Sequence, residues 1–228
     1  MKTAILGTGM VGRAMAEKLR QIGHEVIIGT RNVDATLANT EKDAYGNAPF
    51  KLWHQAHSDI ELDTFEKAAA ATELIFNCTS GQASLTALKL AGVDQLAGKV
   101  LIDLANPLDF SNGMPPSLNP VNTDSLGEQI QREFPKTKVV KTLNTMNVAI
   151  MVDPTRIPGD HNVFICGNDE GAKQQTMQVL HSFGWTPQQI IDLGDISNAR
   201  GTEMMLPIWL RVWHSLGSAE FNFQIAKA

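Results

Sequence analysis

The sequence predicts a doubly wound α/β fold, in which helices cover both faces of a mostly parallel sheet, followed by a small α/β extension that ends in a long helix. Three observations carry this prediction. Apolar stretches of strand length alternate with amphipathic stretches of helix length from residue 2 onward. A cluster of glycines, Gly7, Gly9 and Gly12, separates the first strand from the first helix. The last apolar stretch, from about residue 197, has helical spacing and is too long for a strand.

Each element follows from the spacing of apolar residues. Strands are expected over residues 2–6, 25–28, 60–62, 74–77, 99–103, 138–142, 162–166 and 189–192. Helices are expected over residues 10–22, 64–71, 83–90, 125–134 and 170–183, with a weaker one over 33–44 and a short helical piece near Val148. A loop or a broken helix is expected over residues 46–58. A long loop is expected over residues 106–124, which contain four prolines.

The closing helix has apolar residues on more than one face, at Leu206, Trp209, Leu210, Trp213 and Leu216. We therefore expect it to be buried, partly by a second subunit. Pro207 lies inside it and predicts a kink or a break. Arg200 and Glu203 have the i, i+3 spacing of a helical ion pair, and contact with a substrate is the alternative role.

Composition narrows the class of protein. The 228 residues carry a formal net charge of -5, which disfavours nucleic acid and anionic membrane surfaces as partners. The two cysteines, Cys78 and Cys166, cannot form a disulfide framework, and no Cys/His cluster has zinc spacing, so no metal site is predicted. The sequence shows neither a secretory leader nor an apolar run of membrane-spanning length. We expect a cytoplasmic protein in a reducing compartment.

The glycine cluster predicts a dinucleotide-binding loop of Rossmann type. Gly7-Thr8-Gly9-Met10-Val11-Gly12 has the pattern G-x-G-x-x-G, directly after a strand and at the start of a helix. The first glycine permits the tight turn, the second lets the pyrophosphate approach the backbone, and the third allows close packing of helix on strand. The helix N-terminus then offers N–H groups and partial positive charge to the phosphates.

The end of the second strand indicates which dinucleotide binds. NAD-binding proteins usually place a carboxylate there, whereas this chain reads Gly29-Thr30-Arg31-Asn32 and has no carboxylate before Asp34. Arg31 can pair with the 2′-phosphate of NADP, and Thr30 and Asn32 can donate hydrogen bonds to it. The sequence therefore predicts NADP(H) as the cofactor, held by a domain of residues 1–145, with residues 146–228 completing the site.

Other strand ends are expected to meet the ribose and nicotinamide part of the cofactor, because ligands of open α/β sheets bind at the carboxyl ends of strands. These segments are Cys78-Thr79-Ser80-Gly81, Ala105-Asn106-Pro107 and Leu143-Asn144-Thr145-Met146-Asn147. Plainer readings stay open: a small buried side chain for Cys78, a helix cap for Thr79 and Ser80, and a turn residue for Asn106.

With these motifs in view, the chain resembles the F420-dependent NADP oxidoreductase family, whose fold recurs in STEAP-type metalloreductases. The resemblance runs nearly end to end. It includes the glycine cluster, Gly29-Thr30-Arg31, Lys141-Thr142-Leu143-Asn144-Thr145, Val163 to Asp169, and Asp192-Leu193-Gly194 through Ala199-Arg200 and Glu203. The segments 46–58 and 106–124 look longer than in the archetypal reductases, and Asn144 stands where those often show a histidine.

The resemblance implies that NADP(H) is bound by Thr8, Gly9, Met10, Val11, Thr30, Arg31, Thr79, Ser80, Asn106 and Val148. It also implies a homodimer, with a second cofactor or substrate (F420, FMN or FAD) near Asn144 and Phe221. Further candidates at the nicotinamide are Met146 and His214. We expect hydride transfer between NADP(H) and a flavin or deazaflavin, chemistry that needs little acid–base help. Two alternatives stay open: an NADPH-dependent reductase of a small carbonyl or imine metabolite, and a non-catalytic NADP(H)-binding redox sensor.

Overall fold

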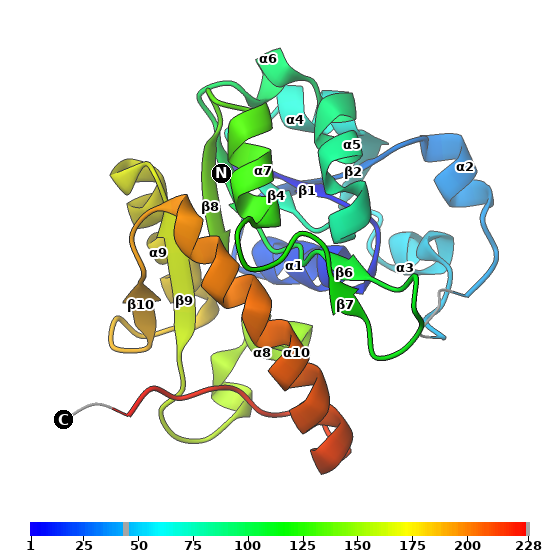
Figure 1. Ribbon diagram of the computed structural model, residues 1–228. Coiled ribbons are helices and arrows are strands. Elements are labelled where there is room, and N and C mark those ends of the chain that lie inside the picture. The colour runs from blue at the N-terminus through cyan, green and yellow to red at the C-terminus, as the bar shows by residue number, and fades with distance from the viewer. Residues whose placement is uncertain (43–45, 227–228) are drawn as a thin grey trace.

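An eight-stranded sheet forms the centre of the structure, a computed structural model that describes residues 1–42 and 46–226 (Figure 1). The strand order is β10-β9-β8-β5-β4-β1-β2-β3. Neighbouring strands are parallel, apart from the antiparallel pair of β8 and β9. The chain adds β2 and β3 on one side of β1 and then returns to place β4 on the other side. The order of the strands therefore reverses between β1 and β4, the position where open α/β sheets bind ligands.

The predicted central strands are all present. They are β1 (Lys2–Leu6), β2 (Glu25–Thr30), β3 (Glu61–Thr64), β4 (Leu74–Asn77), β5 (Val100–Asp103), β8 (Lys138–Thr142), β9 (Val163–Gly167) and β10 (Ile190–Asp192). Strand β2 is two residues longer than predicted, because Gly29 and Thr30 pair with β3. The predicted loop 106–124 contains a two-stranded antiparallel pair, β6 (Leu108–Asp109) and β7 (Ser117–Leu118).

Helices cover both faces of the sheet, and each face has its own apolar core. One core includes side chains from α1 (Met10–Gln21), α3 (Phe50–Ala56), α8 (Val148–Val152) and α9 (Glu170–Phe183). The other includes side chains from α4 (Phe65–Ala70), α5 (Gly81–Ala91), α6 (Val93–Leu96) and α7 (Leu126–Glu133). Strand β1 alternates between them: Ile5 belongs to the first core, and Ala4 and Leu6 belong to the second. This alternation explains why the central strands are apolar on both faces.

Two segments after β2 differ from the prediction. Helix α2 (Val33–Ala38) ends earlier than expected, and residues 43 and 44 of the predicted helix lie outside the described residues. Residues 50–56, predicted as a loop or a broken helix, form the continuous helix α3. Phe50 is buried in the core beneath α3, and Trp53 packs against that core. Tertiary packing of this kind stabilises a short helix that local propensity alone does not predict.

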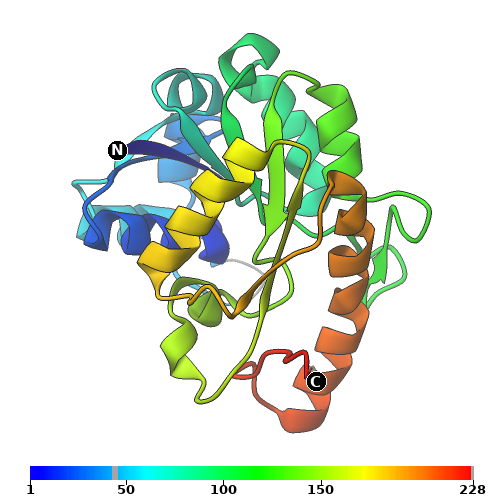
Figure 2. The same cartoon turned by 90° about the vertical axis from the view of Figure 1, so that its left-hand side faces the viewer.

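The closing helix α10 (Ala199–Leu216) follows a short 3₁₀ turn, η2 (Ile196–Asn198). A break at Pro207 does not occur, because α10 continues through it; Pro207 is exposed, while Leu206 and Trp209 are buried. Ala199, at the start of α10, packs in the core on the face opposite α9. Figure 2 shows α9 in yellow and α10 in orange as separate helices. The outer side of α10 is exposed within one chain, and its burial by a second subunit stays a prediction.

The ion pair predicted within α10 is wrong. Arg200 instead bonds Glu128 of α7, with its Nε and one terminal nitrogen 2.8 and 2.6 Å from the two carboxylate oxygens. Glu203 instead pairs with Lys141 of β8, at 2.9 Å. Both side chains find charged partners on other elements, which spacing along one helix cannot reveal. The division at residue 145 stays a prediction; strands β9 and β10 continue the same sheet.

Candidate functional site

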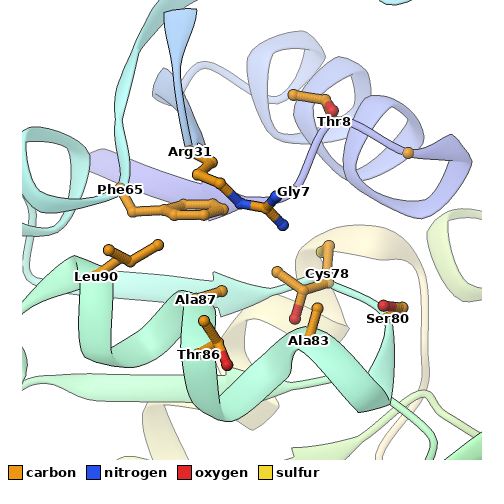
Figure 3. A pocket seen from close by; sticks show the side chains of 12 residues that line it. Gly7, Thr8, Arg31, Phe65, Cys78, Ser80, Ala83, Thr86, Ala87 and Leu90 are labelled. Carbon is orange, nitrogen blue, oxygen red and sulfur yellow. The ribbon is translucent and has the colours of Figure 1, made fainter. Parts of the chain in front are cut away.

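A cavity of about 200 Å³ opens where β1 and β4 end, at the reversal of the strand order (Figure 3). Its lining includes seven of the predicted binding residues: Gly7, Thr8, Gly9, Arg31, Cys78, Thr79 and Ser80. These residues come from the ends of three adjacent strands, β2, β1 and β4, in agreement with the rule that strand ends converge on one site.

The three glycines of the loop occupy different structural environments. Gly7 has a φ of +123°, and a Cβ there would lie 2.7 Å from the carbonyl oxygen of Cys78. A Cβ at Gly12 would lie 2.1 Å from the carbonyl oxygen of Gly7, so this glycine lets α1 pack closely against the loop. Gly9 has no atom within 4 Å of its Cβ position and an ordinary φ of -73°. The fold itself therefore requires Gly7 and Gly12, whereas the space over Gly9 is open to a ligand.

Two helices, α1 and α5, begin beside the cavity. Among the described residues, no side chain caps the N-terminus of either helix. Gly9 is the N-cap of α1, and the first turn of α1 carries no acidic residue. Ser80 is the N-cap of α5, but no first-turn N–H donates to its side chain. The first N–H groups of a helix have no partner within the helix and carry partial positive charge. An anionic group between these helix ends would be favourably placed.

Arg31 is the cation of this cavity. It follows β2 directly, and its guanidinium lies near the Phe65 ring and opposite the start of α5 (Figure 3). None of the described lining residues is acidic. The other two residues predicted for the 2′-phosphate do not line the cavity: Thr30 is buried with its hydroxyl 2.7 Å from that of Thr36, and Asn32 caps α2 by accepting from the Ala35 N–H at 2.9 Å.

Sequence reasoning missed the apolar wall of the cavity. This wall consists of Phe65, Ala83, Thr86, Ala87 and Leu90. Four of these residues follow one another on one side of α5 at helical spacing, and that spacing was the available signal. They were missed because small and apolar residues on a helix after a strand usually indicate core packing.

The predicted nicotinamide side is formed by two asparagines at the ends of β5 and β8. The Nδ2 of Asn106 donates to the backbone oxygen of Asn144 at 2.7 Å, and the Nδ2 of Asn144 donates to the Oδ1 of Asn106 at 2.9 Å. Asn144 is buried, and its Oδ1, like the hydroxyl of the neighbouring Thr145, has no partner in the described protein. Buried polar atoms normally have a partner, so these two can accept a hydrogen bond from a bound ligand or water.

The remaining candidates, like Asn106 and Asn144, are not among the residues that line the cavity. Met10 is exposed and borders a second, shallower hollow beside α3, and Val11 packs against the core. Met146 and Val148 are buried in the core that includes α1 and α8. Two candidates belong to the C-terminal end. His214 is exposed in the last turn of α10, and Phe221 stacks on Trp209 with ring centroids 5.3 Å apart.

Cys78 lines the cavity but is not an activated thiol. Burial raises the pKa of its thiol above the ordinary value, and the charge of Asp103 raises it further. The thiol therefore stays protonated at neutral pH, and a nucleophilic role would require the opposite shift. This finding favours the plainer reading, in which Cys78 is a small wall residue.

Known proteins resemble this chain in sequence and in fold. A family model described as NADP oxidoreductase, coenzyme F420-dependent, matches residues 2–107. The crystal structure of a candidate F420-dependent NADP reductase from Arthrobacter sp. FB24 is 57% identical, covers 100% of both chains and has a TM-score of 0.94. The chain belongs to the F420-dependent NADP oxidoreductase family. The family predicted from the sequence is thereby confirmed, as are the fold class and the assignment to NADP-dependent oxidoreductases.

Two relatives place this member within the wider group. The F420-dependent NADP reductase of Methanocaldococcus jannaschii is 26% identical over 212 residues, which are 91% of this chain and 90% of the relative. Metalloreductase STEAP3 of Rattus norvegicus is 29% identical over 213 residues. The match covers 91% of this chain but only 38% of STEAP3, so the chain spans well under half the length of that relative.

Two kinds of feature are absent from the described residues. Across residues 1–42 and 46–226, no helix is both long and apolar enough to cross a membrane. Within the same ranges, no group of three or more His, Cys, Asp or Glu residues is arranged to hold a metal ion.

Proposed function

We propose that this chain transfers a hydride between NADP(H) and a small-molecule redox substrate, namely a flavin or a deazaflavin of the F420 type. The carrying observation is the cavity at the reversal of the strand order, which combines an exposed guanidinium with an open glycine loop and has no carboxylate among its described lining residues. Membership of the F420-dependent NADP oxidoreductase family supports the same cofactor and the same class of acceptor.

The described residues fit a phosphorylated dinucleotide. The open space over Gly9 and the uncapped start of α1 would receive the pyrophosphate, next to Thr8, Met10 and Val11. Arg31 would pair with the 2′-phosphate, and the apolar wall would cover the adenine. We place the ribose and nicotinamide beyond Thr79 and Ser80, near Asn106, Asn144, Met146 and Val148.

NADP(H) would supply or accept the hydride, and the chain's own residues would set distance, orientation and dryness. Asn106 and Asn144 hold each other and so fix the ends of β5 and β8 relative to one another. The free Oδ1 of Asn144 can orient an N–H group of the ligand. Cys78, whose raised pKa keeps it neutral, adds no charge to the cavity wall.

The test of cofactor choice is Arg31→Ala. Loss of a charge-assisted hydrogen bond of roughly 1.5–3 kcal/mol predicts about tenfold to a hundredfold weaker NADPH binding, with NADH binding nearly unchanged. Arg20→Ala is the matched control, because Arg20 lies near the other end of α1 and pairs with Asp59. Calorimetry with both dinucleotides measures the effect. Equal losses for NADPH and NADH, or no binding of either by the unaltered protein, would refute the assignment.

The acceptor is tested by following oxidation of NADPH with F420, FMN, FAD, ferric chelates and a set of small carbonyl and imine compounds, each at saturating NADPH. Turnover with F420 or a flavin supports the proposal. Turnover confined to a carbonyl or imine substrate would replace it with the metabolite-reductase alternative. Tight NADPH binding without turnover on any of these compounds would replace it with the sensor alternative.

We further propose a homodimer in which a second copy covers the outer side of α10. Met204 and Ile208 expose large apolar side chains on this side, and Trp213 and Leu216 add exposed apolar surface near the end of the helix. Ile208→Glu should shift the protein toward monomer in sedimentation velocity. Val93→Glu on α6 is the control, since both side chains are 51% exposed. A monomeric unaltered protein, or a dimer insensitive to Ile208→Glu, would contradict this assembly.

A further inference from the structure

Three charged side chains meet inside the protein, away from water. Lys141 of β8 and Asp103 of β5 are fully buried, and Glu203 of α10 is 2% exposed. The ammonium of Lys141 lies 2.8 Å from Asp103 Oδ2 and 2.9 Å from Glu203 Oε1. Burial alone would lower the pKa of Lys141, but the two carboxylates raise it above its ordinary value, so the ammonium stays charged.

The excess negative charge of this cluster also has a partner. Glu203 accepts hydrogen bonds from the backbone N–H groups of Leu126 and Gly127, at 2.9 and 3.0 Å. These groups belong to the first turn of α7, whose N-terminus carries partial positive charge. Glu203 thus connects the cluster to α7 and α10. Asp103 and Lys141 can therefore form further hydrogen bonds elsewhere.

One arm of the cluster reaches the wall of the cavity. Asp103 Oδ1 accepts from the Nδ2 of Asn77 at 2.8 Å, which turns the Oδ1 of Asn77 toward the end of β4. There it accepts from both the hydroxyl and the N–H of Thr79, at 2.7 and 3.3 Å. Thr79 is a lining residue of the cavity. Three consecutive polar side chains, Asp103, Asn77 and Thr79, therefore connect Lys141 to the site.

A second arm holds the loop after β5. The N–H of Ala105 donates to Asp103 Oδ1 at 3.2 Å, and the carbonyl oxygen of Ala105 accepts from the Lys141 ammonium. The N–H and the carbonyl oxygen of Ala105 are thus both held by the ion pair. The next residue is Asn106, which exchanges two hydrogen bonds with Asn144. The same pair of charges therefore determines the shape of two strand-end loops.

We propose that Lys141 and Asp103 are positioning residues for the dinucleotide, an inference that rests on the function proposed above. A buried ion pair is often no more stabilising than apolar residues of the same volume, so stability alone gives little reason for one here. Its bonds instead go to the two loops beside the cavity, which a precise site must hold rigidly. Lys141 and Asp103 touch no ligand in this arrangement; they act through Thr79 and Asn106.

The test removes the pair and keeps the charge balance. The double variant Lys141→Met/Asp103→Asn leaves Glu203 with its two N–H donors on α7. The matched control is Lys173→Met/Asp192→Asn, which removes another ion pair of a buried lysine, 2.8 Å long, between α9 and β10. Each protein is titrated with NADPH by calorimetry below its own unfolding midpoint, and the emission of bound NADPH is recorded at saturation.

The positioning role predicts that the dissociation constant for NADPH rises about tenfold or more in the Lys141/Asp103 variant and less than twofold in the control. The emission of bound NADPH should move toward that of free NADPH in the first variant only, because the ring is held less rigidly. Equal losses in both variants, or affinities within twofold of the unaltered protein, would overturn the role while leaving the proposed function intact. An unaltered protein that binds no NADPH would overturn both.

Asn77→Leu is the second variant, since it cuts the arm to Thr79 without leaving a buried charge unpaired. We expect NADPH binding about threefold to fivefold weaker than in the unaltered protein, with the far-ultraviolet circular dichroism unchanged. Unaltered affinity in this variant would remove that arm from the proposal. If neither this variant nor the double variant folds, the network is needed for folding itself and the positioning role is wrong.

Discussion

The cavity around Arg31 and the buried strand ends at Asn144 differ in how their polar groups are used. Arg31 is exposed and lines the same cavity as apolar wall residues such as Phe65 and Leu90. Asn144 is buried, is bonded twice to Asn106 and is linked through that residue's loop to the Lys141–Asp103 pair. Arg31 offers a free charge to a ligand. At Asn144, by contrast, the polar groups are already held in place by hydrogen bonds within the protein.

This difference separates affinity from positioning. A free charge contributes when the ligand arrives, and its removal should leave the fold unaffected. A bonded pair contributes before the ligand arrives, and its removal should change both stability and the precision of the site. Substitutions that separate binding from stability therefore test whether the two regions work in different ways.

The largest contrast is expected within the glycine loop. Gly12→Ala places a methyl 2.1 Å from the carbonyl oxygen of Gly7 and should lower the free energy of unfolding by roughly 3 kcal/mol. Gly9→Ala meets no protein atom within 4 Å, so the unfolding free energy should fall by no more than about 1 kcal/mol, the cost of alanine at an N-cap. Its methyl would occupy the proposed path of the pyrophosphate and weaken NADPH about tenfold. Urea unfolding and calorimetry measure the two effects; a Gly9→Ala protein with full NADPH affinity contradicts the proposed phosphate site.

A smaller effect is expected at the bonded asparagines. Asn106→Ala leaves the amide nitrogen and the backbone oxygen of Asn144 without their partner, and Asn144 is only 2% exposed. The unfolding free energy should fall by roughly 1–3 kcal/mol. NADPH should bind more weakly, while 2′,5′-ADP, which lacks the nicotinamide half, should bind as before. A double-mutant cycle with Asn144→Ala should give a coupling of about 1 kcal/mol. Equal losses for NADPH and 2′,5′-ADP would show that the two regions are not independent.

The parts of the molecule that the sequence predicted are those with local signals. The central strands are continuous apolar runs, and Gly7, Gly9 and Gly12 sit between a strand and a helix in a fixed spacing. Arg31 was predicted because it directly follows a strand of a sheet whose strand ends converge. In each case a few neighbouring residues carry the information, so no knowledge of distant contacts is needed.

The parts that were not predicted depend on contacts between distant residues. Lys141 forms its ion pairs with residues 38 and 62 positions away along the chain, and Arg200 bonds a carboxylate 72 positions away. Helix α3 depends on the burial of Phe50, and the apolar wall depends on which side of α5 faces the cavity. Spacing along one element shows which residues share a face but not what that face meets.

The smallest effect concerns Cys78, a lining residue of the cavity. At pH 8 a thiol with an ordinary pKa near 8.5 is about a quarter thiolate, the reactive form. Burial raises the pKa of Cys78, so iodoacetamide should modify it at least roughly tenfold more slowly in the folded protein than in urea. Because the folded state holds this proton more tightly, the thiol's contribution to stability is present below the ordinary pKa and is lost as the pH rises above it. Mass spectrometry of the labelled peptide measures the rate, and rapid modification of Cys78 in the folded protein would show an activated thiol in the wall of the site.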